Sequence, residues 1–92
     1  MKRLEVVIKG NVQGVFFRYN TQLKARKLSL TGWVKNMPDG TVHAVFEGDS
    51  DKLNDILKFC ENGPKMAEVS KVIAEYKTPT KEFKDFEIRY NY

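Results

Sequence analysis

The chain begins with a segment in which apolar and polar residues alternate. Apolar side chains occupy every second position, at Leu4, Val6 and Ile8, with a charged residue on either side of the run. This is the period of a strand with one buried face, so residues 4–9 are predicted to form a strand that ends at Gly10. Residues 10–15 lack the alternation and contain two glycines, and we expect them to form a loop.

Two later segments have the 3.6-residue period of an amphipathic helix. In the first, the inward positions are Phe17, Thr21, Ala25 and Leu28. In the second, they are Leu53, Ile56, Leu57 and Cys60. The side chains of Asp49 and Ser50 can cap the start of this second helix. We expect it to end at Gly63-Pro64, because glycine accepts the turn after a helix and proline cannot continue one.

The rest of the chain reads as strands. β-prone residues fill 32–36 and 41–47, and the Pro-Asp-Gly turn between them predicts a hairpin. Residues 69–76 and 86–90 are two further predicted strands, separated by a polar connection. The resulting order is that of the split βαβ motif. We therefore predict an α+β fold, a ferredoxin-like α/β sandwich of βαββαβ order with an extra C-terminal strand and two helices on one face of an antiparallel sheet.

Composition narrows the class of protein. Residues 1–92 carry no low-complexity tract or internal repeat, so we expect one domain. The only cysteine, Cys60, excludes an internal disulfide and any two-cysteine metal motif, and its place on the apolar stripe predicts a core position. No apolar run is long enough for a signal peptide or a membrane span. These features favour a cytoplasmic protein without a membrane partner.

The chain is basic, with a net charge of +4 and a pI near 9.2. Such a charge suits an anionic ligand. The lysines are nevertheless spread along the sequence, whereas a nucleic-acid interface requires a patch or a stripe of positive charge. We expect no nucleic-acid partner.

The first candidate for chemistry is the turn from the first strand into the first helix. Gly10 and Gly14 bracket it, and Arg18 follows in the first helical turn. Backbone N–H groups at such a turn, with the positive end of the helix, can bind a phosphate, and the arginine fork adds two matched donors. The sequence alone also allows an ordinary glycine-bounded turn. No Gly-Lys-Ser/Thr follows, so this is not a Walker loop.

The second candidate is Asn36, at the end of a predicted strand just before the hairpin turn. Asparagine is common beside turns for purely structural reasons. In a site, its amide oxygen could instead accept a proton of a water molecule and so direct the water's lone pair. The sequence leaves both roles open, and they are compatible.

Longer motifs now make a family resemblance specific. Residues 10–18 read G-N-V-Q-G-V-F-F-R and resemble the acylphosphatase signature G-x-V-Q-G-V-x-F-R without a gap. Residues 32–42 read G-W-V-K-N-M-P-D-G-T-V, similar to the second family signature G-W/Y-V-x-N-x-x-D-G-x-V, and E-G follows at 47–48. Weaker matches lie at 63–72 and 86–90. Together they span nearly the whole chain in the family's order.

The resemblance implies the family's ferredoxin-like fold and its hydrolysis of acyl phosphates to a carboxylate and inorganic phosphate, with no metal or organic cofactor. Matched by position, the catalytic residues are Arg18 and Asn36. The implied phosphate-binding residues are Gly10, Asn11, Val12, Gln13, Gly14, Val15, Phe16, Phe17 and Arg18. The expected partner is a small acyl phosphate bound by a monomer. The general base stays open, with the substrate's own phosphate as one possible acceptor.

The chain departs from the family pattern at three places. Ser29 stands where the family often has glycine, which would cost about 1 kcal/mol if φ is positive there. His43 replaces a frequent acidic residue, and without a second ligand it predicts no metal site. Residues 91–92 extend past the usual end, which leaves the place of the C-terminal carboxylate open. Phe16, Phe17 and Tyr19 could stack on a ligand, but aromatics at helical spacing are usually core residues; Tyr19 is left undecided.

Three rival functions are weighed against this one. An RNA-binding RRM shares the order of elements, but residues 41–46 lack its aromatic motif. A metallochaperone-like module would need a Cys-x-x-Cys loop. A non-catalytic domain of the acylphosphatase type is disfavoured because both catalytic matches are present.

Overall fold

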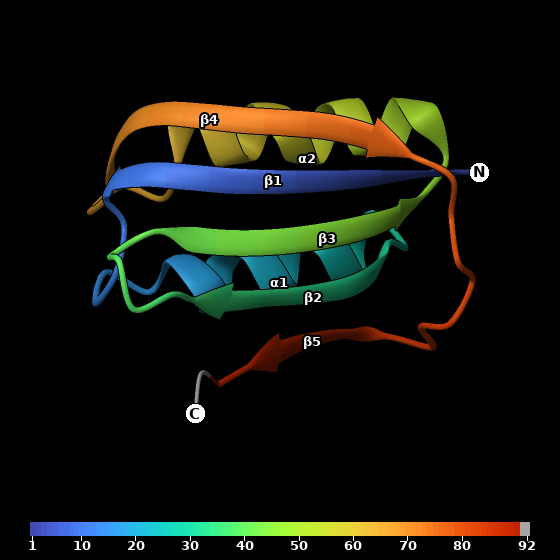
Figure 1. Ribbon diagram of the computed structural model, residues 1–92, viewed down its shortest axis with the longest axis horizontal. Helices are drawn as coiled ribbons and strands as arrows, with labels where there is room; N and C mark the ends of the chain where they lie inside the picture. Colours follow the sequence, from blue (N-terminus) through green and yellow to red (C-terminus); the bar gives the residue numbers. More distant parts are fainter. Residues whose placement is uncertain (91–92) are drawn as a thin grey trace.

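The computed structural model describes residues 1–90 of the chain (Figure 1). Its elements follow the predicted order of strands and helices. They are β1 Lys2–Asn11, α1 Phe17–Lys27, β2 Thr31–Asn36, β3 Val42–Gly48, α2 Ser50–Asn62, β4 Glu68–Lys77 and β5 Phe86–Arg89. The predicted start and end of the second helix are confirmed, although the Asp49 side chain at its N-cap forms no capping hydrogen bond.

The strands form one sheet in the order β4-β1-β3-β2-β5. The pairs β4-β1, β1-β3 and β3-β2 are antiparallel, as predicted, but β5 is parallel to β2, so the expectation of a wholly antiparallel sheet is wrong for this strand. The connection from 78 to 85 explains the difference, because it passes along the end of the sheet before β5 begins (Figure 1). The strand then runs in the same direction as β2.

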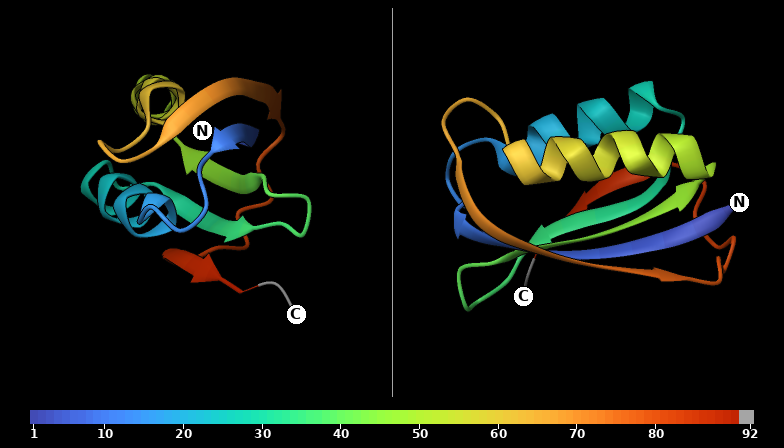
Figure 2. Two further views of the ribbon diagram at one scale, coloured as in Figure 1. Left: turned by 90° about the vertical axis from the view of Figure 1, so that its left-hand side faces the viewer. Right: turned by 90° about the horizontal axis from the view of Figure 1, so that it is seen from above.

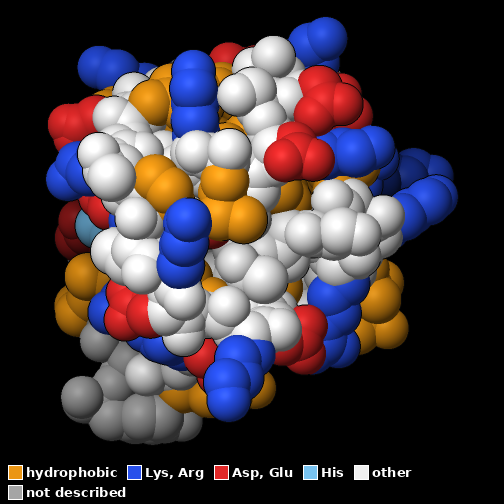
Figure 3. Space-filling view, turned by 90° about the vertical axis from the view of Figure 1, so that its right-hand side faces the viewer, with side chains coloured by type: hydrophobic (Ala, Val, Ile, Leu, Met, Phe, Trp, Pro, Cys, Tyr) orange, Lys and Arg blue, Asp and Glu red, His pale blue; other side chains and the backbone are white. Residues whose placement is uncertain are grey.

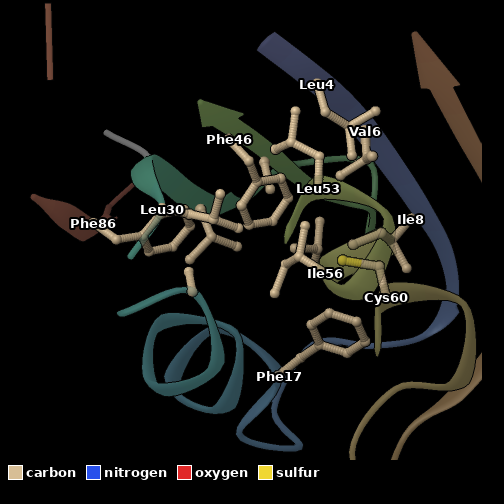
Figure 4. Close-up of a cluster of buried hydrophobic side chains, with 14 of the residues drawn as sticks. Leu4, Val6, Ile8, Phe17, Leu30, Phe46, Leu53, Ile56, Cys60 and Phe86 are labelled. Atoms are coloured by element: carbon tan, nitrogen blue, oxygen red, sulfur yellow. The ribbon is translucent and has the colours of Figure 1, made fainter. Parts of the chain in front are cut away.

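Both helices lie on one face of the sheet, and the core fills the space between (Figure 2). The alternation of β1 turns Leu4, Val6 and Ile8 inward, as predicted. Phe46 and Phe86 stack within this core with ring centroids 5.2 Å apart (Figure 4). Cys60 is buried among these side chains, which confirms its predicted core position. Burial raises the pKa of its thiol to about 12, so the group stays protonated at neutral pH.

Gly10 does not end the first strand. β1 continues to Asn11 through a register shift against β4, where Lys9 faces Lys71 and Gly10 faces Val69. Gly10 has φ +132°, and a Cβ atom at this position would collide with the carbonyl oxygen of Glu68. Glycine therefore permits a close approach of the two backbones at an irregular point of the sheet.

Ser29 has φ 59° at the end of α1, in the left-handed region. The positive φ on which the expected strain depends is therefore present, and a side chain in this conformation costs about 1 kcal/mol relative to glycine.

Glu47 is the one buried acidic side chain within residues 1–90. Its Oε2 accepts hydrogen bonds from Arg3 Nη1 and from the backbone N–H of Thr80, both at 2.9 Å, and its Oε1 accepts one from the N–H of Lys81 at 2.9 Å. Burial alone would raise the pKa of this carboxyl, but the hydrogen bonds from Thr80, Arg3 and Lys81 together outweigh it and lower the pKa. Glu47 thus fastens the connection that leads to β5.

We predict that Glu47→Gln, which keeps the shape but removes the charge, lowers the free energy of unfolding at pH 7 by about 2 to 3 kcal/mol. The folded-state pKa lies below the ordinary value of 4.5, so the stability that the charge provides is complete above that pH and is lost as the pH falls through the folded-state pKa. Urea unfolding at several pH values should therefore show the two proteins converging below about pH 4.5.

The matched control is Glu87→Gln, since Glu87 is exposed and, within residues 1–90, forms an ion pair with Arg89 alone, at 3.3 Å. It should change stability little. A deficit of Glu47→Gln that stayed constant from pH 7 to pH 3 would show that the ionised carboxylate is not what holds the connection.

Candidate active site

The pairing of β1 with β3 decides where the two candidate motifs meet. The strands are antiparallel, with Ile8 opposite Val42. The loop that leaves β1 and the hairpin that leads into β3 therefore open at the same edge of the sheet, on the left in Figure 1. Because β5 is parallel to β2, its C-terminal end reaches this edge as well.

A cleft of about 510 Å³ lies at this edge. It brings together Arg18 and Asn36, the two predicted catalytic residues. Its described lining is Val12, Gly14, Phe16, Phe17, Arg18, Tyr19, Asn36, Ile88 and Tyr90. Four of the predicted phosphate-binding residues, Gly10, Asn11, Gln13 and Val15, are not part of this lining.

The start of α1 leaves hydrogen-bond donors without partners. Gly14 and Phe16 have φ of 73° and 61°, and Phe16 is the N-cap with no side-chain capping hydrogen bond. Within residues 1–90 no backbone acceptor is found for the N–H groups of residues 14–18. The first N–H groups of a helix have no intrahelical partner, and they carry the positive end of the helix dipole. This end of α1 can therefore bind an anion.

Arg18 lies in the first turn of α1, at the same cleft. Its Cζ atom is 5.3 Å from the centroid of the Tyr90 ring, a cation–π distance. Among the ion pairs formed within residues 1–90, none involves Arg18. The guanidinium thus adds a fixed positive charge with planar donors next to the open N–H groups.

Asn36 ends β2 and faces Val42 of β3. In the part of the chain that the structure describes, its Oδ1 is the one buried side-chain polar atom with no hydrogen-bond partner. A buried acceptor without a donor costs about 1 to 3 kcal/mol, so such an atom calls for an explanation.

The turn itself does not supply that explanation. Asp39 Oδ1 accepts hydrogen bonds from the Thr41 hydroxyl at 2.6 Å and from the Thr41 N–H at 3.0 Å. Both hydrogen bonds lower the pKa of the Asp39 carboxyl, and the bond from the Thr41 hydroxyl has the larger effect. The turn is thus held by Asp39 and Thr41, and the side-chain oxygen of Asn36 takes no part in it.

Gln13 joins the loop to the hairpin. Its Nε2 donates to the carbonyl oxygens of Met37 and Thr41, at 2.8 and 2.9 Å. Both protons of the amide are therefore used within the protein, and they hold the hairpin next to the loop. The sequence motif included Gln13 but gave no sign of this bracing contact, which depends on how the two segments fold together.

Sequence reasoning missed two lining residues and misjudged the burial of a third, Phe16, which it had included in the predicted phosphate-binding loop. Ile88 and Tyr90 reach the cleft only because β5 is parallel to β2. Phe16 was expected in the core, but its side chain is 72% exposed, whereas Phe17 is buried as predicted. Tyr19, left undecided, is 53% exposed at the rim of the cleft.

The sequence of the chain matches a family model described as Acylphosphatase over residues 4–88. The chain belongs to the acylphosphatase family. An acylphosphatase of Geobacter metallireducens is 46% identical over 88 residues, which cover 96% of this chain and 95% of the relative. One from Syntrophus aciditrophicus is 46% identical over 91 residues, which cover 99% and 95%.

Solved structures agree with this family. The crystal structure of an acylphosphatase from Bacillus subtilis has a TM-score of 0.94 and 33% identity, with 98% of this chain and 100% of that chain covered. An acylphosphatase from Coxiella burnetii has a TM-score of 0.90 and 39% identity, with 96% and 92% covered. Full-length HypF matches with a TM-score of 0.83 and 26% identity over 96% of this chain and 12% of its own.

These findings confirm the predicted ferredoxin-like fold and the family. The protein is accordingly a hydrolase acting on acid anhydrides, with a small acyl phosphate as substrate. An acylphosphatase needs a place for a phosphoryl group, and the uncapped end of α1 beside Arg18 offers donors for one.

The bracing role of Gln13 gives a prediction for this acylphosphatase. Gln13→Met keeps the length of the side chain but removes both donors, so the hairpin that carries Asn36 is freed to shift. We expect kcat for benzoyl phosphate to fall about 10- to 100-fold, as a displacement of about 1 Å can cause. Steady-state kinetics on the folded variant measure this loss.

A double-mutant cycle then tests whether Gln13 affects catalysis through the position of Asn36. If Gln13 acts by placing Asn36, the same substitution in an Asn36→Ala background should cost little more. An equal loss in both backgrounds would mean that Gln13 acts in another way. Gln22→Met is the matched control, because Gln22 donates to the Phe86 carbonyl at 3.2 Å and, within residues 1–90, forms no side-chain hydrogen bond to the hairpin.

Proposed function

We propose that this acylphosphatase cleaves the carboxyl–phosphate bond by in-line attack of a water molecule. In this proposal Asn36 positions the water, while Arg18 and the backbone N–H groups of the loop hold the phosphoryl group. The observation that carries the proposal is the buried, unpartnered Oδ1 of Asn36 in the same cleft as the uncapped N-terminus of α1.

The donors match a phosphoryl group. The N–H groups of residues 14–18, which have no backbone acceptor within residues 1–90, and the Arg18 fork all offer hydrogens to anionic oxygens. In phosphoryl transfer, charge is spread over the three equatorial oxygens in a loose transition state. Donors that the backbone already holds in place stabilise this charge without reorganising during the reaction. We propose that residues 10–17 act as a phosphate-binding loop in this sense, mainly through their backbone.

The acceptor matches a water molecule. An amide oxygen can only accept, so an anionic phosphoryl oxygen cannot satisfy Asn36 Oδ1. A water molecule can donate one hydrogen to it, and this hydrogen bond fixes the direction of the lone pairs. Donors for the anion and an acceptor for the nucleophile would then meet in one cleft.

The bond changes balance without a protein acid. The water oxygen forms a bond to phosphorus as the bond from phosphorus to the acyl oxygen breaks, and that electron pair leaves with the carboxylate. Carboxylates are weak bases, with a pKa near 4, so the leaving group needs no proton. A proton of the attacking water passes to a phosphate oxygen of the substrate, which gives inorganic phosphate.

The remaining parts of the proposal concern cofactors and setting. We propose that catalysis needs no metal ion and no organic cofactor, and that residues 1–92 act as one monomeric domain in the cytoplasm, without a nucleic-acid or membrane partner. Over residues 1–90 no group of three His, Cys, Asp or Glu side chains is placed to hold a metal ion. The face at the other end of the sheet from the cleft mixes basic and acidic side chains, with no patch of one sign (Figure 3).

A separate finding concerns membranes. Over the same described residues, none of the helices has the length and apolar character needed to span a bilayer.

We expect the two proposed catalytic residues to give different kinetic signatures with benzoyl phosphate. Asn36→Ala should lower kcat about 10²- to 10³-fold with little change in KM, because it removes a contact to the attacking water. Arg18→Ala should lower kcat and raise KM, because the guanidinium holds the phosphoryl group in both the ground state and the transition state. Initial-rate kinetics with a chelator present would measure both effects.

Controls separate this result from misfolding and from other phosphatase activity. Arg26 lies on α1, as Arg18 does, but its side chain forms an ion pair with Asp85 at 3.0 Å. Asn62 lies at the end of α2. The variants Arg26→Ala and Asn62→Ala should therefore both retain wild-type rates. A phosphate monoester should not be hydrolysed, since its leaving group is a stronger base. Full activity of folded Asn36→Ala would contradict the water-positioning role, and loss of wild-type activity with the chelator would contradict metal independence.

A further inference from the structure

We propose that the cleft beside Arg18 is an acyl-binding subsite that selects uncharged, apolar acyl groups, aromatic or aliphatic. This inference rests on the proposed function, because the position of the phosphoryl group fixes where the acyl group must go. The attacking and leaving oxygens lie in line across phosphorus. The acyl group is therefore on the side away from the water at Asn36, and the rest of the same cleft is the space left for it.

That space has an apolar, aromatic lining. Phe16, Tyr19 and Tyr90 are 72%, 53% and 60% exposed, and all three line the cleft together with the partly buried Ile88. Phe16 and Tyr19 come from the start of α1, whereas Ile88 and Tyr90 come from β5 and the residue after it. These segments are distant in sequence, and only the fold brings them together. Aromatic and aliphatic side chains that gather around one hollow are typical of a ligand site.

Phe16 is unfavourable in two respects at once. Its φ of 61° lies in the left-handed region, which strains a residue with a Cβ atom, and its ring remains in water. Both are explained if this backbone conformation opens the phosphate loop and presents the ring to the acyl group of the substrate.

The charge of the lining decides which acyl groups fit. Arg18 is the one charged side chain among the described residues around the cleft. Once its guanidinium holds the phosphoryl group, the described lining offers no second cation to pair with a negative charge on the acyl group. A charge removed from water without a partner is costly, so acyl phosphates that carry a further carboxylate should be poor substrates.

Chain length gives the first test. Acetyl, butanoyl and hexanoyl phosphate have leaving groups of nearly equal reactivity, because the added methylenes lie far from the bond that breaks. Full burial of a methylene corresponds to about a fourfold gain in binding, so in an open cleft we expect kcat/KM to rise about twofold per methylene. A flat series would overturn the proposal.

Charge gives the second test, through benzoyl phosphate and 4-carboxybenzoyl phosphate. We expect kcat/KM to be at least about tenfold lower for the carboxylated substrate. The protein's net charge of +4 would by itself attract the more negative substrate, so this field predicts the opposite order. Equal or reversed values would contradict the subsite.

A substitution in the cleft tests whether the preference for longer acyl chains arises there. Tyr19→Ala should lower the ratio of kcat/KM for hexanoyl phosphate to that for acetyl phosphate about threefold or more, as expected for lost apolar contact. Tyr76→Ala is the matched control, since Tyr76 is 46% exposed on β4 and does not line the cleft, and it should leave the ratio unchanged. An equal loss for both substrates in Tyr19→Ala would contradict a role in binding the acyl group.

The two proposals fail in different ways. If acetyl phosphate is hydrolysed in an Asn36-dependent reaction while the chain-length series is flat, the subsite is overturned and the proposed function stands. If no acyl phosphate is hydrolysed by the folded protein, both are overturned.

Discussion

The antiparallel pairing of β1 with β3 is the constraint on which the rest of the site depends. It fixes the loop after β1 and the hairpin before β3 at one edge of the sheet. Gln13 then joins the loop to the hairpin by donating two hydrogen bonds to the carbonyls of Met37 and Thr41. Without this pairing, the donors at the start of α1 and the acceptor on Asn36 would have no defined relation to each other.

The site consists of polar groups that the fold leaves unsatisfied in complementary ways. Among residues 1–90, the start of α1 presents N–H donors without acceptors, and Asn36 Oδ1 is an acceptor without a donor. Each lowers the stability of the folded chain, and together they fit an anion and a water molecule. The opposite end of the sheet shows the contrast, because there the buried Glu47 carboxylate is fully paired with Arg3, Thr80 and Lys81. The chain therefore satisfies its buried polar groups where they serve the fold and leaves them open at the cleft.

Local patterns in the sequence predicted most of the fold. The periods of 2 and 3.6 residues placed the first strand and both helices, since they report which face of an element is buried, and β-prone residues with turn signals placed most of the other strands. They could not show that β5 is parallel to β2, because a strand's partner depends on the path of the connection before it. Nor could they show that Gly10 lets β1 continue, because that depends on how closely β4 approaches.

The site was predictable to a different degree. Motif resemblance pointed to Arg18 and Asn36, and the structure places both in one cleft. The exposure of Phe16, the bracing contacts of Gln13 and the contribution of Tyr90 were not predictable. Each arises from segments that are distant in sequence or from a backbone conformation that residue type does not specify. The predicted C-terminal extension at residues 91–92 lies outside the described residues.

The central claim is that water attacks phosphorus rather than the acyl carbon, and one isotope measurement tests it directly. Benzoyl phosphate is hydrolysed by the enzyme in water enriched in heavy oxygen, under conditions where the uncatalysed reaction is negligible, and both products are analysed by mass spectrometry. The account predicts that the label enters inorganic phosphate and that benzoate stays unlabelled. Label in benzoate would show attack at the carbonyl carbon and would contradict the roles proposed for Asn36 and Arg18.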